Sequence, residues 1–175
     1  MKINLHMPQE RQDFRFTKEG GWFSHLIEGA EPGFNLSPVV VVCELARAVG
    51  AWVLSGRLET TARLGCSRCL EETSIPILTD FRYALVPPPE QEPSQEELSP
   101  DELDFIFCEG DSLDLDPIIF EQIVLQLPMK ALCRDDCRGL CHHCGTNLNN
   151  SSCSCNPKLI NTGFSVLKDF NLKNN

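Results

Sequence analysis

The sequence has no apolar run long enough to cross a membrane. The longest, Val39–Cys43, has five residues, whereas a transmembrane helix needs about 20. Polar residues also interrupt Met1–Glu10, so the chain does not start with the apolar core of a signal peptide. We therefore expect a protein that stays where it is made, in the cytoplasm, with a plastid location only if a transit peptide is missing from this chain. Its hydrophobic content of 42% excludes disorder over the full length.

Positive charge is missing from one long stretch. No Lys or Arg occurs between Arg82 and Lys130, where twelve acidic residues lie, while the rest of the chain has 15 basic and 13 acidic residues. The net charge of −10 thus comes from one insert and argues against a general nucleic-acid binder, which is usually basic. Like charge favours a solvated loop; an acidic arm for a partner, or a mask over a basic face, is the alternative. The bases available to phosphates are Arg57, Arg63, Arg68, Arg82, Arg134, Arg138 and Lys158.

Three long runs of β-branched, aliphatic and aromatic residues predict strands. They cover 37–49, 51–64 and 73–86 and are separated by short breaks, which is typical of an antiparallel β-meander or a partly open barrel. Alternating polar and apolar residues at Asp13–Thr17 predict one further strand. The fold class we expect is α+β, with one or two helices and a cysteine-rich zinc module at the C-terminus.

An amphipathic helix is predicted after the acidic insert. Asp116 serves as its cap, Pro117 lies in its first turn, and Pro128 ends it. Its apolar face comprises Ile119, Ile123 and Leu127, with Phe120 and Val124. A second, short helix is expected around Phe164, Leu167 and Phe170.

These elements predict three parts that form one integrated domain. Residues 1–89 are the β region, with a Cys-x2-Cys hairpin tip. Residues 90–112 are an acidic, flexible insert, because their composition is rich in Glu, Gln, Ser and Pro. Residues 113–175 hold the helix and the cysteine-rich module.

Cysteine provides the strongest functional signal. Eight of the ten cysteines fall in close groups, and these are Cys66, Cys69, Cys133, Cys137, Cys141, Cys144, Cys153 and Cys155. Without a secretion signal, clustered thiols favour metal binding over disulfides. Zn²⁺ suits sets of four thiolates, so eight ligands predict two closed sites and two ions. Cys43 and Cys108 stand alone among apolar residues, where buried thiols are expected.

The eight thiols can be divided between two ions in more than one way. The division we favour closes one site with Cys141, Cys144, Cys153 and Cys155, and the other with Cys66, Cys69, Cys133 and Cys137. The second of these would fasten the hairpin to the C-terminal module across more than sixty residues. The rival division uses Cys133, Cys137, Cys141 and Cys144 for one ion. His142 or His143 could replace a sulfur, but turn residues of this kind usually face solvent.

The catalytic alternatives are weaker. Cys137-x3-Cys141-x2-Cys144 has the spacing of a radical-enzyme iron–sulfur site, but those enzymes need a barrel for which this chain has no room. Cys66-x2-Cys69 could be a redox dithiol, yet that motif normally opens a helix in a βαβ unit. The sequence has no Ser/His/Asp set and no glycine-rich phosphate loop. We expect no catalytic residues and no cofactor besides Zn²⁺.

Taken together, the cysteine blocks resemble those of a known family. Gly65-Cys66-Ser67-Arg68-Cys69-Leu70-Glu71 precedes an acidic middle, and Glu121 then lies on a helix that runs into Leu127-Pro128. After Cys133 come Cys137-Arg138-Gly139-Leu140-Cys141-His142-His143-Cys144-Gly145-Thr146-Asn147-Leu148-Asn149 and Cys153-Ser154-Cys155. From about residue 35 onward, this pattern resembles the YceD-like proteins, also called large ribosomal RNA subunit accumulation proteins.

The resemblance implies metal binding by the eight clustered cysteines, nucleic-acid binding, and a role in the accumulation or processing of 23S ribosomal RNA. Two departures from the family pattern stand out. His142 replaces a proline that often follows the cysteine matching Cys141, and Asn161-Thr162-Gly163 replaces Asp-Pro-Arg before the last helix. The role of that basic residue therefore cannot be transferred.

We expect a non-enzymatic zinc protein that assists large ribosomal subunit biogenesis. Its partner would be ribosomal RNA or a ribosome-assembly protein, and no membrane. Arg68, Arg134 and Arg138 lie between the thiols, where they would either hydrogen-bond the thiolates or face phosphate. The rival hypothesis is a protein–protein adaptor with purely structural zinc and no RNA contact.

Overall fold

The computed structural model describes residues 1–5, 10–27, 33–48, 51–88, 105–108 and 110–155. The main sheet contains β2 (Arg11–Lys18), β3 (Phe34–Leu36), β4 (Val39–Ala48), β5 (Ala51–Gly65), β6 (Glu72–Val86) and β7 (Phe105–Phe107). A separate two-stranded ribbon pairs β1 (Lys2–Asn4) with β8 (Ser112–Asp114). The helices are a 3-10 helix, η1 (Trp22–Leu26), and α1 (Leu115–Gln126).

The main sheet is open and has the strand order β2-β4-β5-β6-β7, with β3 also pairing to β5. Consecutive strands β4, β5 and β6 pair antiparallel, which confirms the predicted meander. The last pair, β6 with β7, is parallel, so the sheet is mixed. The register of β5 and β6 runs as far as Gly65 opposite Glu72, and this places residues 66–71 at the tip of a long hairpin.

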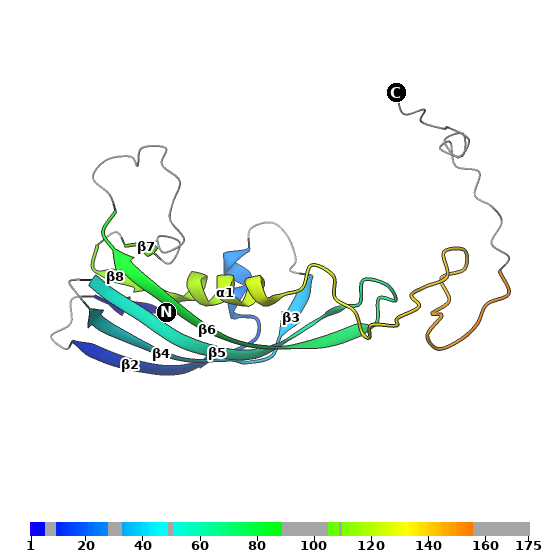
Figure 1. The fold of residues 1–175 in the computed structure, drawn as a ribbon, viewed down its shortest axis with the longest axis horizontal. Helices are drawn as coiled ribbons and strands as arrows, with labels where there is room; N and C mark the ends of the chain where they lie inside the picture. The colour runs from blue at the N-terminus through cyan, green and yellow to red at the C-terminus, as the bar shows by residue number, and fades with distance from the viewer. Residues whose placement is uncertain (6–9, 28–32, 49–50, 89–104, 109, 156–175) are drawn as a thin grey trace, which may run out of the picture.

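The hydrophobic core lies between the sheet and its helices. Figure 1 shows α1 and η1 over the same face of the sheet. Alternate residues of β4 and β5 point into this layer, including Val41, Leu45, Leu54 and Leu58, all fully buried. Burying an aliphatic side chain of this size contributes roughly 1.5–3 kcal/mol. The core is therefore built by the long strands together with α1 and η1, and it does not include the hairpin tip.

The start of α1 differs from the sequence-based prediction. Its N-cap is Asp114, whose carboxylate accepts from the Asp116 amide at 3.2 Å. Pairing of β8 with β1 continues to Asp114, and this fixes the helix start two residues early. Asp116 is instead mostly buried beside the Lys18 ammonium, 3.1 Å away. Pro117 lies in the first turn, as expected.

The buried face of α1 is also slightly rotated from the predicted one. Ile119 and Ile123 are buried as expected, and Ile118 joins them. Val124 is 42% exposed, because a helix that packs through Ile119 and Ile123 turns the residue after Ile123 about 100° away. The helix ends at Gln126, two residues before Pro128.

Some of the sequence-based predictions concern residues outside the described segments. The helix expected around Phe164, Leu167 and Phe170 lies outside the described residues, as does most of the insert 90–112. The division into 1–89, 90–112 and 113–175 remains a prediction. Of the helices in the described segments, neither has the length and apolar character needed to cross a bilayer.

The two isolated cysteines lie in the main core or at its edge. Cys43 is 3% exposed, and burial raises the pKa of its thiol to about 11. Cys108 is half-buried, and burial raises its pKa as well. Both therefore behave as neutral packing residues at physiological pH.

Candidate metal centre

The first cysteine pair is presented by the hairpin tip. The Leu70 amide donates to the Cys66 carbonyl at 2.9 Å, and the Cys66 amide donates to the Glu71 carbonyl at 2.8 Å. These bonds close a tight turn on the end of β5 and β6. The Arg68 amide also donates to Cys66 Sγ at 3.5 Å. Such a turn brings the two thiols of a Cys-x2-Cys pair to one side.

A second turn of the same kind occurs at Cys141–Cys144. The Gly145 amide donates to the Cys141 carbonyl at 2.8 Å, matching the bond made by Leu70 in the hairpin. In both turns the residue after the second cysteine is left-handed, with φ of +72° at Gly145 and +62° at Leu70. Glycine adopts this conformation freely, but a leucine there is strained.

Leu70 therefore provides a test of turn strain. The left-handed conformation costs an L-residue about 1–2 kcal/mol. Glycine avoids this cost, but it loses more conformational entropy on folding, which offsets about 0.5–1 kcal/mol of the gain. The Leu70 side chain is 72% exposed, so its removal loses little packing. We expect Leu70→Gly to raise the free energy of unfolding by up to about 1 kcal/mol, measured by denaturant titration. A loss of stability would show that the leucine side chain supports the turn.

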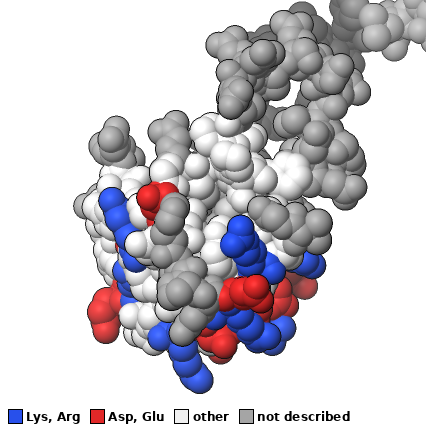
Figure 2. All heavy atoms as spheres, turned by 90° about the vertical axis from the view of Figure 1, so that its left-hand side faces the viewer, with Lys and Arg blue, Asp and Glu red and all other residues white. Residues whose placement is uncertain are grey.

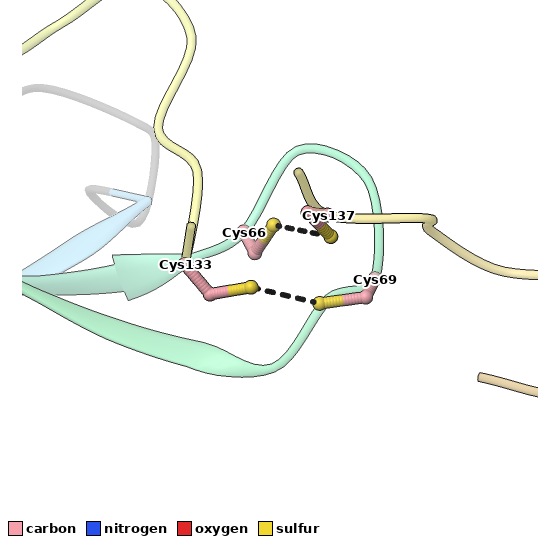
Figure 3. Close-up of side chains that lie close together, drawn as sticks. All are labelled: Cys66, Cys69, Cys133 and Cys137. Carbon is pink, nitrogen blue, oxygen red and sulfur yellow. Dashed lines mark hydrogen bonds between the residues drawn. The ribbon is translucent and has the colours of Figure 1, made fainter. Parts of the chain in front are cut away.

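Four thiols converge where the hairpin meets the chain after α1 (Figure 3). Cys66 Sγ lies 3.8 Å from Cys137 Sγ, and Cys69 Sγ lies 3.7 Å from Cys133 Sγ. A tetrahedron of sulfurs, each about 2.3 Å from a zinc ion, has edges of about 3.8 Å. A disulfide would bring two sulfurs to about 2.05 Å. The spacing thus fits four ligands around one ion and does not fit S–S bonds.

The other four clustered thiols form a second group. The Sγ atoms of Cys141, Cys144, Cys153 and Cys155 all lie within 4.8 Å of one another, as those of the first group do. The structure therefore groups the eight cysteines as the favoured division predicts, and it separates Cys133 and Cys137 from Cys141 and Cys144. The side chains of His142 and His143 are exposed and belong to neither sulfur group.

The two groups differ in their exposure to solvent. Cys66, Cys69 and Cys137 are at most 4% exposed and form a small cluster with Leu132 and Leu140. In the second group Cys141 is buried, whereas Cys144 is exposed. The first group is thus a buried junction between the hairpin and the chain after α1, and the second is a loop site open to solution.

Hydrogen bonds from the surrounding chain favour thiolates in both groups. The Arg68 and Cys69 amides lower the pKa of Cys66 to about 6. The Asn149 side-chain amide, 3.3 Å from Cys137 Sγ, lowers the pKa of that thiol. The Thr146 hydroxyl and amide lower the pKa of Cys144 to about 6. Hydrogen bonds to the charged form favour ionisation, so part of each group is prepared to ionise.

Other thiols of the two groups have raised pKa values and stay neutral. Burial and then the adjacent thiols raise the pKa of Cys133 to about 12, and Cys144 raises that of Cys155 to about 12. Four thiolates cannot crowd together without a cation, because like charges repel. A divalent metal ion supplies that charge and deprotonates the thiols that bind it. The donor set therefore fits a zinc ion in each group.

Comparison with known proteins places the chain in a family. The family model described as "Large ribosomal RNA subunit accumulation protein YceD" matches residues 54–171. The chain belongs to the YceD family. The matched region contains most of β5, all of β6 and α1, and all eight clustered cysteines, so the family match and the two sulfur groups coincide.

Two curated relatives carry the name "Large ribosomal RNA subunit accumulation protein YCED homolog 1, chloroplastic". The protein from Zea mays is 32% identical over 80% of this chain and 55% of its own length. The protein from Arabidopsis thaliana is 27% identical over 75% of this chain and 48% of its own length. The YceD-family chain thus spans about half the length of these relatives. No solved structure matches it.

Arg68 links the hairpin tip to the loop that faces it. Its guanidinium donates to the carbonyls of Cys137 and Asp135, at 2.8 and 3.4 Å, and its own carbonyl accepts from the Leu140 amide at 3.1 Å. Its guanidinium thus bonds carbonyls of the loop rather than a thiolate. The side chain is exposed, and its contact with phosphate stays a prediction. Arg134 forms an ion pair with Asp136 at 3.4 Å.

Basic side chains of this YceD-family chain are mixed with acidic ones. Arg57 makes a two-pronged contact with Asp80, at 2.6 and 2.9 Å, and Arg11 lies 2.8 Å from Glu44. Figure 2 shows Lys and Arg interleaved with Asp and Glu at the end of the molecule that lies away from the cysteines. Lys158 lies outside the described residues.

Four polar residues near the thiols were not predicted from the sequence, and these are Glu71, Asn147, Asn149 and Asn150. Their side chains form hydrogen bonds that connect the turn preceding Cys153 to the hairpin and to Cys137. The only signal was the run of asparagines after Gly145, which is typical of turns. Their partners depend on tertiary structure.

Proposed function

We propose that this YceD-family protein is a non-enzymatic, zinc-stabilised factor that assists the accumulation or processing of 23S ribosomal RNA and thereby large-subunit biogenesis. One observation carries the proposal: two sets of four sulfurs, spaced as zinc ligands are, lie within the region matched by a family described by ribosomal RNA accumulation. The named relatives are chloroplastic, and a cytoplasmic location for this chain remains a prediction.

The proposed ligands are Cys66, Cys69, Cys133 and Cys137 for one ion, and Cys141, Cys144, Cys153 and Cys155 for the other. Bound zinc supplies a closed, structural crosslink in such four-thiolate sites, which leave no position for a reacting water. The chain's own residues prepare the sites through the backbone donors of the two turns. The hairpin tip thereby becomes a fixed attachment point for the segment after α1.

RNA contact is proposed for the end of the molecule that carries the cysteines. Arg138 is exposed beside Cys137, and Arg63 is exposed on β5, two residues before the end of that strand. Neither arginine has a bidentate ion pair of the kind that Arg57 makes with the Asp80 carboxylate. These residues can add phosphate contacts despite the acidic total charge, because screening limits repulsion from distant acids to about 10 Å.

Titration against fragments of large-subunit ribosomal RNA at several salt concentrations tests this proposal. We expect a dissociation constant below about 10⁻⁴ M, which should rise as the salt concentration increases. Arg138→Ala and Arg63→Ala should each lower the salt slope by about one, whereas Arg57→Ala is the matched control and should leave it unchanged. Absence of salt-dependent binding in zinc-loaded protein would contradict the RNA proposal.

The second candidate is a protein–protein adaptor with structural zinc and no RNA contact. The net charge of −10 and the carboxylate partners of Arg11 and Arg57 favour it. The exposed Leu125 and Met129 beside the end of α1 also provide apolar surface. Association with ribosome-assembly proteins in the absence of any affinity for RNA would select this function.

A further inference from the structure

The turn between the two cysteine pairs of the second group reaches the first group. Residues 147–150 lie between Cys144 and Cys153, which both belong to the second group. From this turn, Asn149 Nδ2 donates to Cys137 Sγ of the first group at 3.3 Å. We call the first group the buried site and the second group the exposed site. Cys137, a candidate ligand of the buried site, therefore accepts a hydrogen bond from a loop whose two ends are held by cysteines of the exposed site.

The orientation of this side chain is determined by its other contacts. Asn149 Oδ1 accepts from the Arg138 amide at 2.8 Å, which leaves Nδ2 directed at the sulfur. The backbone amide of Asn149 donates to Asn147 Oδ1 at 2.9 Å. Both bonds hold the donor in place before any metal binds, and such orienting contacts are characteristic of residues that support metal ligands.

A second connection runs from the same turn to the hairpin. Glu71 Oε1 accepts from Asn147 Nδ2 at 2.8 Å and from Asn150 Nδ2 at 3.0 Å. The Glu71 carbonyl also accepts from the Cys66 amide at 2.8 Å, which closes the turn at the hairpin tip. One residue thus joins the turn of the exposed group to the turn of the buried group.

We propose that the two four-cysteine groups bind metal cooperatively, with Asn149 and Glu71 as the positioning residues that couple them. This inference rests on the metal binding put forward above. An ion in the exposed group fixes residues 141–155, and this holds the turn of residues 147–150 against Cys137 and Glu71. Because coupling between two binding sites is reciprocal, an ion in the buried group favours binding in the exposed group equally.

The coupling gives the exposed group a regulatory role. Cys144 is open to solution whereas Cys66 is fully buried, so the exposed ion is the one that chelators and other metal-binding proteins reach first. Loss of this ion removes support from the buried site, which attaches the segment after α1 to the hairpin tip. The strength of that attachment thus depends on the metal supply outside the protein.

Chelator competition on the zinc-loaded protein tests the positioning residues. Outer contacts to metal ligands typically contribute 10–100-fold to metal affinity. Asn149→Ala should therefore lower the affinity of the buried site by about tenfold or more, and Glu71→Gln should lower it less. Ser152→Ala, an exposed change just after the same turn, is the matched control and should have no effect. Equal affinities for the Asn149→Ala and Ser152→Ala variants would overturn the assignment of Asn149.

A double-mutant cycle tests the coupling itself. Cys153→Ser disables the exposed site and should lower buried-site affinity at least about fivefold. In that background Asn149→Ala should add much less than it does alone, because the turn is already released. Cobalt bound in place of zinc, followed by its sulfur-to-metal absorption, reports occupancy without any activity assay. Far-UV circular dichroism confirms that the sheet remains folded.

The outcomes separate the coupling from the proposed function. Suppose that the wild-type chain binds two ions and that Cys153→Ser leaves the zinc affinity of the buried site unchanged. This result would overturn cooperativity and leave the zinc proposal intact. A wild-type chain that binds no zinc would overturn both. If Cys153→Ser disrupts the sheet, Asn149→Asp replaces it as the perturbation: its carboxylate would repel the Cys137 thiolate and should weaken the buried site more than alanine does.

Discussion

Cys66→Ser should reduce bound zinc from two ions to one per chain and release the C-terminal module from the hairpin. Cys66 is fully buried among the thiols of the first group, and serine is a poor zinc ligand there. Structural zinc contributes roughly 10–16 kcal/mol in small modules, comparable with the whole stability of a domain, about 5–15 kcal/mol. We therefore expect this substitution to have the largest effect of those proposed for the chain.

The sheet should survive that substitution. The first sulfur group forms a small cluster with Leu132 and Leu140, separate from the main core, so release of the module leaves the core intact. Limited proteolysis should then cut between 128 and 155, where the zinc-loaded wild-type protein should resist. Cys108→Ser is the control, because that thiol lies outside both groups, and it should retain two ions. Two ions in the Cys66→Ser variant would disprove the first site.

Gly139→Ala is expected to be the second most damaging change. Gly139 has φ of +73°, and a Cβ atom there would lie 2.9 Å from the Arg68 carbonyl oxygen. That oxygen accepts from the Leu140 amide, so it cannot retreat without breaking the contact between hairpin and loop. The left-handed conformation costs about 1–2 kcal/mol, and the clash adds about 1–3 kcal/mol. Chemical denaturation of zinc-loaded protein measures the sum.

Gly110 offers a matched control for the effect of backbone conformation. It has φ of +81°, and a Cβ atom added there would meet no other atom within 4 Å. Gly110→Ala should therefore show the conformational cost alone, about 1–2 kcal/mol. The difference between the two variants measures how closely Arg68 approaches the loop. Equal losses would mean that the hairpin and the loop do not touch at Gly139.

Features that depend on local sequence were predicted well. The strands β4, β5 and β6 follow from long runs of β-branched and apolar residues, because side-chain alternation decides which face is buried. Zinc sites use pairs of cysteines at close spacing, and the structure brings the thiols together in the favoured grouping. The left-handed residue that follows the second cysteine of each turn is a glycine in one of them, Gly145, where glycine is the residue best suited to that conformation.

Features that depend on distant parts of the chain were not predicted. The ribbon of β1 and β8 pairs Lys2 with Asp114, and this pairing moved the helix cap to Asp114. Strand β7 has three residues, too few for a pattern, and no local spacing indicates its parallel pairing with β6. The side-chain bonds of Glu71 join segments more than seventy residues apart, so no local spacing could indicate them.

X-ray absorption at the zinc edge tests most directly whether the eight thiols hold two ions. We expect two zinc ions per chain, each with a shell of four sulfurs at about 2.3 Å and no nitrogen or oxygen ligand. Oxygen or nitrogen in the shell, fewer than two ions in fully reduced protein, or disulfides among the eight cysteines would contradict the two-site assignment.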